Sequence, residues 1–520
     1  MEQVKRRRKN NKVNMIIESL IDYCFRESFL YQLTATLSTY CLINIVWFYR
    51  RRWKRFQLLR VHYDIPGPKP RLYDGNLSLF TGRTPHLVGQ RILQDYGPFH
   101  CVFIGDEPNL IVTDLELLKQ IFIERSSSFK ARMKLYIDGE LSEGILFTTK
   151  YDRYKAMRKV MAPHFNRYTS RGGSQTDFIE VSVRLMLDYI EQRLERSELE
   201  PNKMTANVDM HDLMKSAALH LITSLAIKLP EVQVRERETN VIRLDSFLSK
   251  ADEGVSLQMI RFPVLRRLAQ FVSDHFTVNG LLKKINDELD KSIKEAKKSN
   301  SPAGDNENLQ LIDLLIKLHK EGKMTRDEVV GNGQALLFAG YDTTSTTLTY
   351  AFWAIAKHTD IQDRLRADLM TNGMESKYLT QVVNETLRCY PTATAFTARI
   401  ATKTLTINGL TIPQGTGIMY HQWLMHRDPK IWPEPAKFDP ERFAEGKEHH
   451  PCAYAPFGFG ERKCLGIQLA LLEMKMIICD VLLRFKLNLK APKELELVSY
   501  AAFLSKPKGK VMVELEKLQK

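Results

Sequence analysis

The sequence predicts a mainly α-helical protein with a minor β region and an N-terminal membrane anchor. Three observations support this prediction. Apolar residues recur at helical spacing from about residue 153 to residue 360. Residues 97–123 and 397–420 contain short alternating stretches typical of strands, and residues 29–49 carry no charge. With 520 residues, of which 44% are hydrophobic, the chain is long enough to bury a large core.

The predicted anchor runs from Phe29 to Tyr49, with the sequence FLYQLTATLSTYCLINIVWFY. A helix of this length is about 31 Å long, close to the roughly 30 Å hydrocarbon core of a bilayer. The basic run RRRWKR at residues 50–55 follows it, and basic residues at that edge favour a cytosolic location for the rest of the chain. An amphipathic or buried helix and an organelle-targeting signal are the alternatives.

The net charge of +15 is concentrated near the N-terminus, because residues 1–60 contain 13 Lys and Arg against 4 Asp and Glu. A nucleic-acid-binding protein more often spreads its basic residues over a folded surface, so we expect no nucleic-acid partner. The seven cysteines are scattered and odd in number, which favours a reducing compartment over a disulfide framework.

Local signals divide the chain and place its main elements. IPGPKP at residues 65–70 is a stiff break, because proline fixes φ and resists helix formation. Thr325 and Glu328 have the spacing of a capping box, which predicts a long helix from there to about His358. An Asn-Gly turn at residues 408–409 joins two strands. The predicted organisation is a basic N-terminal segment (1–28), the anchor (29–49), a basic linker (50–64) and one folded domain (65–520).

The stretch FGFGERKCLG at residues 457–466, here called the cysteine loop, combines one cysteine with glycines, aromatics and charged residues. A dinucleotide-binding loop would need a third glycine where Lys463 stands. A zinc site would lack a paired C-x-x-C and would leave the glycines unexplained. The members of that zinc site would be His449, His450, Cys452 and Cys464. A cysteine thiolate that holds a haem iron explains the stretch best.

In this interpretation the residue types of the cysteine loop each have a task. Gly458 and Gly460 allow a tight turn and a close approach to a flat ring, where a Cβ would clash. Backbone N–H groups beyond Cys464, and the start of a helix expected at Leu465, stabilise the negative charge of the sulfur. Phe457 packs beside the thiolate and keeps water away from it.

The cysteine loop matches the haem-binding signature F-x-x-G-x-R-x-C-x-G, and the chain therefore resembles the cytochrome P450 superfamily. The matching residues are Phe457, Gly460, Arg462, Cys464 and Gly466. The resemblance extends from about Ile65 to the C-terminus, and ETLRCYP and INGLTIPQGT resemble the animal microsomal enzymes related to broad drug oxidases and thromboxane synthase. It implies the cytochrome P450 fold as a single haem-thiolate domain, with haem b as cofactor and Cys464 as the axial ligand of its iron.

ETLR at residues 385–388 places an acid and a base three residues apart on one helix face. The resemblance implies that Glu385 and Arg388 join Arg442, from the PERF stretch at residues 440–443, in a buried charged network that holds the cysteine loop. The role of this network would be structural. Removal of one member would leave a buried charge without its partner.

AGYDTT at residues 339–344 lies midway along the long predicted helix, although Asp and Thr compete with the helical backbone for hydrogen bonds. The resemblance implies that Ala339 and Gly340 lie beside the haem, with Gly340 opening a groove over it. It also implies that Thr343 hydrogen-bonds oxygen and water at the haem and that Asp342 relays protons.

The haem carboxylates need cationic partners, and Arg462 is one of them. YKAMR at residues 154–158 resembles the W-x-x-x-R helix of the family, with Tyr154 in the place of tryptophan. The resemblance implies that Arg158 pairs with a propionate and that Arg399 is the strand arginine with the same role. Arg132 in SFKAR is a further expected partner.

The resemblance implies a monooxygenase that inserts one atom of O₂ into a lipophilic xenobiotic, sterol or fatty-acid-like substrate. Electrons would come from NADPH through NADPH–cytochrome P450 reductase, because the chain has no flavin or nicotinamide fingerprint, and cytochrome b5 is a further candidate partner. The expected location is the endoplasmic reticulum membrane with the catalytic domain facing the cytosol, or a mitochondrial membrane. Expected residues of an apolar substrate pocket are Phe338, Thr392, Phe396 and Phe503.

Two alternative functions stay open. An isomerase or dehydratase on the same scaffold would act on peroxides without O₂ or a reductase, and such an enzyme can dispense with the pair formed by Asp342 and Thr343. A non-catalytic haem-binding membrane protein would not need proton-delivery residues. Because both Asp342 and Thr343 are present, the sequence favours oxygen activation.

Overall fold

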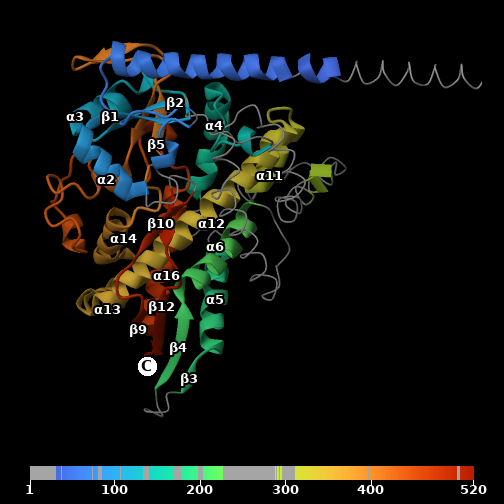
Figure 1. Cartoon of the computed structure of the whole chain (residues 1–520). Coiled ribbons are helices and arrows are strands. Elements are labelled where there is room, and N and C mark those ends of the chain that lie inside the picture. Colours follow the sequence, from blue (N-terminus) through green and yellow to red (C-terminus); the bar gives the residue numbers. More distant parts are fainter. Residues whose placement is uncertain are drawn as a thin grey trace, which may run out of the picture. The chain divides into compact units, whose positions relative to one another are not determined.

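Figure 1 shows the computed structural model of the chain. It describes residues 31–36, 38–72, 74–79, 85–105, 107–132, 140–167, 177–196, 203–226, 287, 290–291, 293–294, 311–395, 397–500 and 504–519. The chain divides into two compact units, of which the first ends at Asp64 and the second, here called the main domain, begins at Ile65. This boundary lies at IPGPKP, where the sequence predicts the start of the folded domain.

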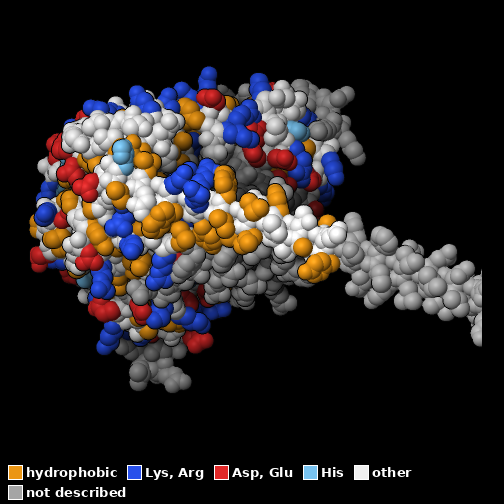
Figure 2. All heavy atoms as spheres, turned by 45° about the horizontal axis from the view of Figure 1, so that its top comes forward, with side chains coloured by type: hydrophobic (Ala, Val, Ile, Leu, Met, Phe, Trp, Pro, Cys, Tyr) orange, Lys and Arg blue, Asp and Glu red, His pale blue; other side chains and the backbone are white. Residues whose placement is uncertain are grey.

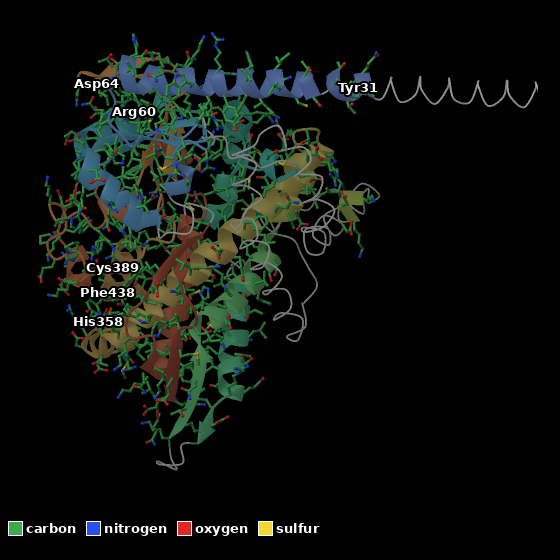
Figure 3. The ribbon with its side chains drawn as sticks, viewed as in Figure 1. Tyr31, Arg60, Asp64, His358, Cys389 and Phe438 are labelled. Carbon is green, nitrogen blue, oxygen red and sulfur yellow. The ribbon has the colours of Figure 1, made fainter. Side chains whose placement is uncertain are left out.

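The first unit is helical through residues 31–36 and 38–57, and a π-helical turn, η1 (Leu58–His62), follows. Figure 3 labels Tyr31 and Asp64 at the two ends of this described segment. Large apolar side chains are exposed along the helix, as the space-filling view also shows (Figure 2). They include Tyr40, Leu42, Ile43, Val46 and Trp47.

In the described part of the chain, no helix is both long enough and apolar enough to cross a membrane. The structure therefore does not show the transmembrane helix predicted for residues 29–49, of which residues 29, 30 and 37 lie outside the described ones. Gln32, Asn44 and several hydroxyl residues lower the hydropathy of this stretch. The Asn44 amide, for example, donates to the carbonyl of Tyr40 at 2.7 Å within the helix.

A four-stranded sheet in the order β1-β2-β8-β5 forms one part of the main domain (Figure 1). Its strands are β1 (Phe99–Ile104), β2 (Glu107–Val112), β8 (Gly417–Tyr420) and β5 (Thr397–Ile400). β2 pairs with β8 in parallel, whereas β1 with β2 and β5 with β8 are antiparallel. The two segments with strand-like alternation thus meet in one sheet, although about 300 residues separate them in the sequence. Local propensity predicts each strand but cannot specify which distant strand it pairs with.

The remaining strands form a second sheet and two hairpins. The second sheet has the order β3-β4-β12-β9, while β6 pairs with β7 and β10 with β11. Their bounds are β3 (Glu195–Arg196), β4 (Met204–Asp209), β6 (Leu405–Ile407), β7 (Leu410–Ile412), β9 (Phe485–Ala491), β10 (Leu497–Tyr500), β11 (Leu504–Pro507) and β12 (Met512–Lys517). Asn408 and Gly409 turn the β6–β7 hairpin with φ of 50° and 80°, so the predicted Asn-Gly turn is confirmed.

Helices form most of the main domain. The α-helices are α2 (Pro85–Tyr96), α3 (Leu115–Lys119), α4 (Tyr151–Arg167), α5 (Asp177–Gln192), α6 (Met210–Ala226), α11 (Leu311–Lys320), α12 (Arg326–Lys357), α13 (Thr359–Asn372), α14 (Lys377–Cys389), α15 (Gln422–Met425) and α16 (Ile467–Arg484). Shorter turns include η3 (Gln120–Glu124), η5 (Glu140–Glu143), η9 (Pro440–Phe443) and η10 (Gly460–Arg462). α12 runs through the middle of the domain, and α6, α14 and α16 pack against it (Figure 1).

The hydrophobic core gathers around these packed helices. Phe352 on α12, Val382 on α14 and Ile478 on α16 belong to one cluster and are fully buried. The same three helices carry or adjoin residues that the sequence singles out: Thr343 lies on α12, and Glu385 lies on α14. The core therefore holds the elements of the candidate site in fixed positions.

The N-terminus of α12 is capped as the sequence predicts. The Thr325 hydroxyl accepts from the Glu328 N–H at 3.2 Å, and Glu328 Oε2 accepts from the Thr325 N–H at 2.8 Å. Glu328 also pairs with Arg153 of α4, whose Nε lies 2.6 Å from Oε1. The predicted capping box is confirmed, and it fastens α4 to the start of α12.

A close backbone crossing joins η5 to α12. A Cβ at Gly331 would lie 2.0 Å from the carbonyl oxygen of Glu140, and a Cβ at Gly144 would lie 2.4 Å from that of Gly331. Next to this crossing, the side-chain oxygen of Asn332 accepts from the Ile145 N–H at 2.9 Å. The glycines therefore allow the chain that leads into α4 to lie directly on α12.

We expect Thr325→Ala to lower the free energy of unfolding of the main domain by about 1 kcal/mol, because the Glu328 N–H loses its acceptor. Thr371→Ala is the matched control, since the Thr371 hydroxyl is exposed and bonds only one turn back on α13. Urea denaturation of the two variants measures the difference. A midpoint for Thr325→Ala equal to that of the wild type would contradict the capping role.

Candidate active site

The cysteine loop is a sequence of tight turns that precedes α16. Gly458 and Gly460 have φ of 75° and 57°, in the left-handed region that favours glycine. The Cys464 N–H donates to the carbonyl of Phe457 at 2.9 Å and closes the loop on itself. A Cβ at Gly458 would lie 3.1 Å from Thr397 Oγ1, so β5 lies directly behind the turn.

α16 begins after Gly466, its N-cap residue, and not at Leu465 as the sequence analysis expects. The reason is that Leu465 and Gly466 form a turn that brings the Gly466 N–H to the sulfur of Cys464. Although the Cys464 side chain is accessible to solvent, the protein around it desolvates the sulfur and raises the pKa of the thiol, and the hydrogen bond from Gly466 and the charge of Arg158 oppose that rise. The Gly466 N–H therefore offsets part of the cost of forming the thiolate.

Cys464 differs from the other described cysteines of the main domain, because it is exposed while Cys101, Cys389, Cys452 and Cys479 are buried. The neighbouring residues of the alternative zinc site have other partners. His449 Nε2 lies 2.9 Å from the carbonyl of Arg442, and His450 Nε2 lies 3.3 Å from Glu116 Oε1. Within the described residues, no group of three or more His, Cys, Asp or Glu is arranged to hold a metal ion.

Four arginines interact near the cysteine loop: Arg132, Arg158 on α4, Arg399 on β5 and Arg462 in η10. We call them the arginine cluster. Burial, together with the charges of Arg399 and Arg462, lowers the pKa of Arg132 to about 9. Burial, together with the charge of Arg462, lowers the pKa of Arg399 to about 10. Burial also lowers the pKa of Arg462, whose Nη1 and Nη2 are buried without a hydrogen-bond partner among the described residues.

Three members of the arginine cluster have no carboxylate partner among the described residues. Arg158, Arg399 and Arg462 bond to backbone carbonyls and to the Tyr154 hydroxyl, and not to carboxylates, among the described residues. Buried like charges without counter-charges destabilise one another. A flat ring with two carboxylates, as haem has, would supply the negative charge next to an accessible cysteine sulfur. The residues present therefore fit a haem group.

Tyr154 fastens α4 to the cysteine loop. Its hydroxyl donates to the carbonyl of Glu461 and accepts from Arg158 Nη1 at 3.0 Å. The Arg462 guanidinium lies 3.8 Å from the centre of the Tyr154 ring, in cation–π contact. Arg158 Nη1 also donates to the carbonyl of Lys463 at 2.7 Å. Tyr154 thus provides both an aromatic surface and a hydroxyl at this position.

The expected oxygen-activation residues lie midway along α12. The Thr343 hydroxyl donates to the carbonyl of Ala339 at 2.6 Å, and Asp342 is buried. A Cβ at Gly340 would lie 2.5 Å from Cδ1 of Ile222 on α6. Gly340 therefore permits close packing of α6 on α12, and the groove over the haem that the sequence analysis expects at Gly340 stays a prediction.

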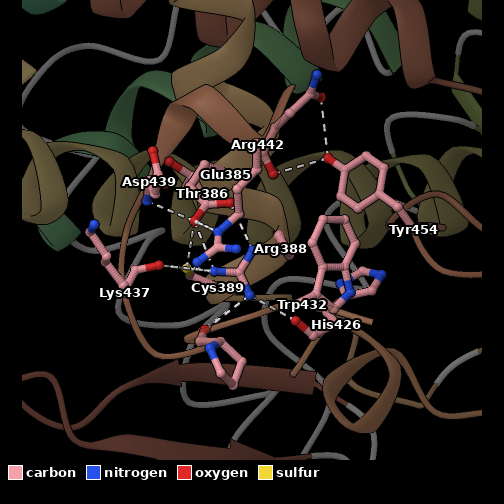
Figure 4. Close-up of polar contacts among 12 residues, drawn as sticks. Glu385, Thr386, Arg388, Cys389, His426, Trp432, Lys437, Asp439, Arg442 and Tyr454 are labelled. Carbon is pink, nitrogen blue, oxygen red and sulfur yellow. Dashed lines mark hydrogen bonds and ion pairs between the residues drawn. The ribbon is translucent and has the colours of Figure 1, made fainter. Parts of the chain in front are cut away.

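The predicted charged network is assembled in the structure (Figure 4). Glu385 and Arg388 are fully buried and form a bidentate pair, with Arg388 Nε 2.7 Å from Oε2 and Nη2 2.8 Å from Oε1. Arg442 Nε lies 3.5 Å from Glu385 Oε1, and the Asp439 N–H donates to the same oxygen at 2.8 Å. Glu385 is therefore held by α14, by η9 and by the residue before η9.

Arg388 uses its remaining N–H groups to hold irregular chain. Nη1 donates to the carbonyls of His426 at 2.8 Å and Pro435 at 2.9 Å, and Nη2 donates to that of Lys437 at 3.1 Å. The guanidinium carbon lies 5.4 Å from the centre of the Trp432 ring. One buried arginine thus organises the chain between α15 and η9, which has no helix or strand hydrogen bonds of its own.

The expected pocket residues are described in part. Thr392 is buried, and its hydroxyl lies 2.9 Å from that of Thr347 on α12. Phe338 is half-buried on α12 and packs against the main hydrophobic cluster. Phe396 and Phe503 lie outside the described residues.

Phe459 and Tyr420 support the cysteine loop, and the sequence analysis does not identify either of them. Phe459 is buried, and its ring lies 4.9 Å from that of Tyr420 and 5.3 Å from that of Phe122. The Tyr420 hydroxyl donates to the carbonyl of Cys452 at 3.1 Å. An aromatic residue between two glycines is the sequence signal that marks Phe459 as an anchor of the turn.

Glu473 on α16 is a buried carboxyl group. It is only 3% exposed, and its Oε1 has no hydrogen-bond partner among the described residues. Burial raises its pKa from 4.5 to about 8. The side chain is therefore neutral at acidic pH and becomes costly to keep buried as the pH rises.

The chain was compared with known proteins. The sequence model of the family Cytochrome P450 matches residues 65–513. Cytochrome P450 3A29 of Sus scrofa is 27% identical over 479 residues, which cover 87% of this chain and 91% of that protein. Cytochrome P450 3A11 of Mus musculus is 27% identical over 487 residues, and Cytochrome P450 3A14 of Cavia porcellus is 28% identical over 449 residues. These cover 86% and 81% of this chain and 91% and 85% of the relatives.

We expect Glu385→Gln to lower the free energy of unfolding by about 3–5 kcal/mol, because Arg388 would remain as a buried charge without its counter-charge. Glu445→Gln is the matched control, since it breaks an ion pair with Lys377 in which both side chains are exposed. Denaturant titration of both variants gives the comparison. A loss below about 1 kcal/mol for Glu385→Gln would contradict the proposed importance of the pair.

Glu473→Gln should change how stability depends on pH. Because the pKa is higher in the folded state, folding binds a proton, and the wild type loses stability as the pH rises from 4.5 to about 8. The free energy of unfolding of Glu473→Gln relative to the wild type should therefore increase over this range, by up to about 1.4 kcal/mol per pH unit. Glu448→Gln, at an exposed position, is the control, and its free energy of unfolding should change with pH in the same way as that of the wild type. A constant difference between Glu473→Gln and the wild type would refute a buried neutral carboxyl group.

Proposed function

The chain belongs to the cytochrome P450 family and is a P450 monooxygenase, and we propose that its substrate is a small lipophilic molecule of the xenobiotic, sterol or fatty-acid class. One atom of O₂ enters the substrate and the other leaves as water, in a reaction that uses two electrons and two protons. NADPH supplies the electrons through NADPH–cytochrome P450 reductase, with cytochrome b5 as a second donor. The observation that carries the proposal is an accessible cysteine sulfur beside three arginines, Arg158, Arg399 and Arg462, that make no hydrogen bond or ion pair to a carboxylate among the described residues.

Residues of the site have distinct tasks in holding the haem. Cys464 ligates the iron through its thiolate, and Arg132, Arg158, Arg399 and Arg462 neutralise the two propionates. The bound haem supplies the activation of O₂, for which a thiolate ligand donates electron density. Phe457, Gly460 and Gly466 shape the cysteine loop, and the Gly466 N–H lowers the basicity of the sulfur.

Residues of α12 supply the protons that the reaction consumes. Thr343 donates to the carbonyl of Ala339, so the lone pairs of its hydroxyl oxygen remain free to accept a hydrogen bond from a water at the reacting position. The neighbouring Asp342 is buried and passes protons from inside the domain to that water. Splitting of O₂ needs these protons, which is why a P450 isomerase can dispense with this pair of residues.

The proposed pocket and location follow from apolar surfaces. Phe338 and Thr392 border a pocket that excludes water from the substrate. The apolar side chains exposed on the N-terminal helix, next to the basic residues 50–55, attach the protein to the cytosolic face of the endoplasmic reticulum membrane. The attachment brings the enzyme to a membrane in which lipophilic substrates dissolve.

Replacement of Cys464 tests the proposed function most directly. The reduced wild-type protein with CO should show the red-shifted Soret band typical of thiolate coordination, and Cys464→His should lose it. Cys479→Ser is the matched control, because that buried cysteine lies within α16, where its replacement should leave the band unchanged. A wild-type protein that binds haem but shows the band of imidazole coordination would overturn the assignment.

The same preparation separates the monooxygenase from the alternatives. Product formation from a lipid library should require both NADPH and the reductase. Conversion of hydroperoxides that persists without either would indicate an isomerase or dehydratase. Binding of haem without any turnover, together with a normal CO spectrum, would indicate a haem-binding protein.

A further inference from the structure

His426 lies between the buried ion pair and the cysteine loop. It directly follows α15 as its C-cap residue and is fully buried. In Figure 4 it lies near Trp432, and a dashed line joins its carbonyl to Arg388. Nothing in the signature of the cysteine loop or in the spacing of Glu385 and Arg388 assigns a role to this histidine.

The backbone and the side chain of His426 bond to different parts of the site. Its carbonyl accepts from Arg388 Nη1 at 2.8 Å, and its ring Nε2 accepts from the Ala455 N–H at 3.2 Å. Ala455 in turn accepts from the Gly458 N–H at 3.1 Å, in the first turn of the cysteine loop. His426 therefore links Arg388, which binds its backbone, to the chain at the start of the cysteine loop, which its ring binds.

The ring is in the protonation state that this connection requires. A neutral imidazole has one acceptor nitrogen, and an imidazolium has none. Burial, together with the charge of Arg388, lowers the pKa of His426 to about 3. Nδ1 lies toward the carbonyl of Leu387, in the last turn of α14, although it makes no well-aligned hydrogen bond there. The proton on Nδ1 leaves Nε2 as the acceptor for Ala455.

Aromatic packing fixes the orientation of the ring. The His426 ring lies 5.3 Å from that of Tyr454 and 6.4 Å from that of Tyr420. Both tyrosines are themselves held, because the Tyr454 hydroxyl donates to the carbonyl of Asn384 at 3.1 Å and the Tyr420 hydroxyl to that of Cys452 at 3.1 Å. The ring therefore cannot turn its Nε2 away from Ala455 without disturbing its neighbours.

We propose that His426 is a positioning residue that couples the Glu385–Arg388 pair to the cysteine loop and so keeps Cys464 in the position for iron ligation. This inference rests on the proposed role of Cys464 as the haem ligand. The neutral ring does not touch the haem or the substrate in this scheme. The His426 ring accepts a hydrogen bond from the Ala455 N–H, while Arg388 binds the backbone carbonyl of His426.

Three variants of the full-length haem-loaded protein test the inference. His426→Phe keeps a ring of similar size but removes the acceptor, whereas His426→Gln carries an amide oxygen near the position of Nε2. His319→Phe is the control, because His319, on α11, contacts the backbone carbonyl of Met324 and has no part in the chain of bonds. For each variant we measure amide hydrogen exchange in the peptide 452–460 and the share of the reduced CO complex that has the thiolate-type Soret band.

His426→Phe should speed exchange in this peptide by about tenfold, the effect of one lost hydrogen bond, and should convert a measurable share of the CO complex to the form without thiolate ligation. His426→Gln and His319→Phe should both stay close to the wild type. If His426→Phe keeps wild-type exchange and a wild-type spectrum, the inference is wrong.

The outcomes for the inference and for the proposed function are separate. A wild-type protein without the thiolate-type band contradicts the role of Cys464, whatever the His426 variants do. A wild-type protein with the band, combined with unchanged His426→Phe, contradicts the inference alone. If His426→Phe does not accumulate in folded form, His426→Gln decides: wild-type exchange and spectrum support the acceptor role, and fast exchange with loss of the band overturns it.

Discussion

The buried pair of Glu385 with Arg388 is the interaction on which the irregular chain between α15 and η9 depends. Removal of two charges from water is costly, so such a pair persists only when nearly every donor and acceptor is satisfied. Here the carbonyls of His426, Pro435 and Lys437 and the N–H of Asp439 supply the remaining bonds. The charge pair thereby fixes the conformation of the segment between α15 and η9, which lacks regular secondary structure.

The arginine cluster adds a second constraint, which couples the fold to the cofactor. The charges of Arg399 and Arg462 lower the pKa of Arg132, and that of Arg462 lowers the pKa of Arg399, so the convergence of these arginines opposes folding of the protein alone. Two propionates would reverse this balance, because each negative charge would stabilise several buried cations at once. Haem binding would then stabilise the folded domain by mass action, and the ligand would complete the electrostatics of the core.

Local signals predicted several elements correctly. The capping box of Thr325 with Glu328, the Asn408–Gly409 turn and the two strand-like segments are found in the structure, because each depends on residues a few positions apart. The start of α16 was placed two residues too early, since the turn at Gly466 serves the Cys464 sulfur before the helix begins. The contact of Gly340 with Ile222 was also missed, because periodicity does not reveal which helix lies opposite a given face.

The sequence by itself determined the chemistry of the site, because the cysteine loop, the Glu385–Arg388 spacing and the Asp342–Thr343 pair are short contiguous motifs whose residue types carry their own meaning. Only the tertiary structure decided how distant residues meet around these motifs. Arg158 on α4, Arg399 on β5 and Arg132, which lies in neither a helix nor a strand, converge near the cysteine loop, and His426 reaches Ala455 across the irregular chain between them. Such contacts arise from the packing of α12, α14 and α16 and the sheet, and no local pattern encodes a distance between residues that are far apart in the chain.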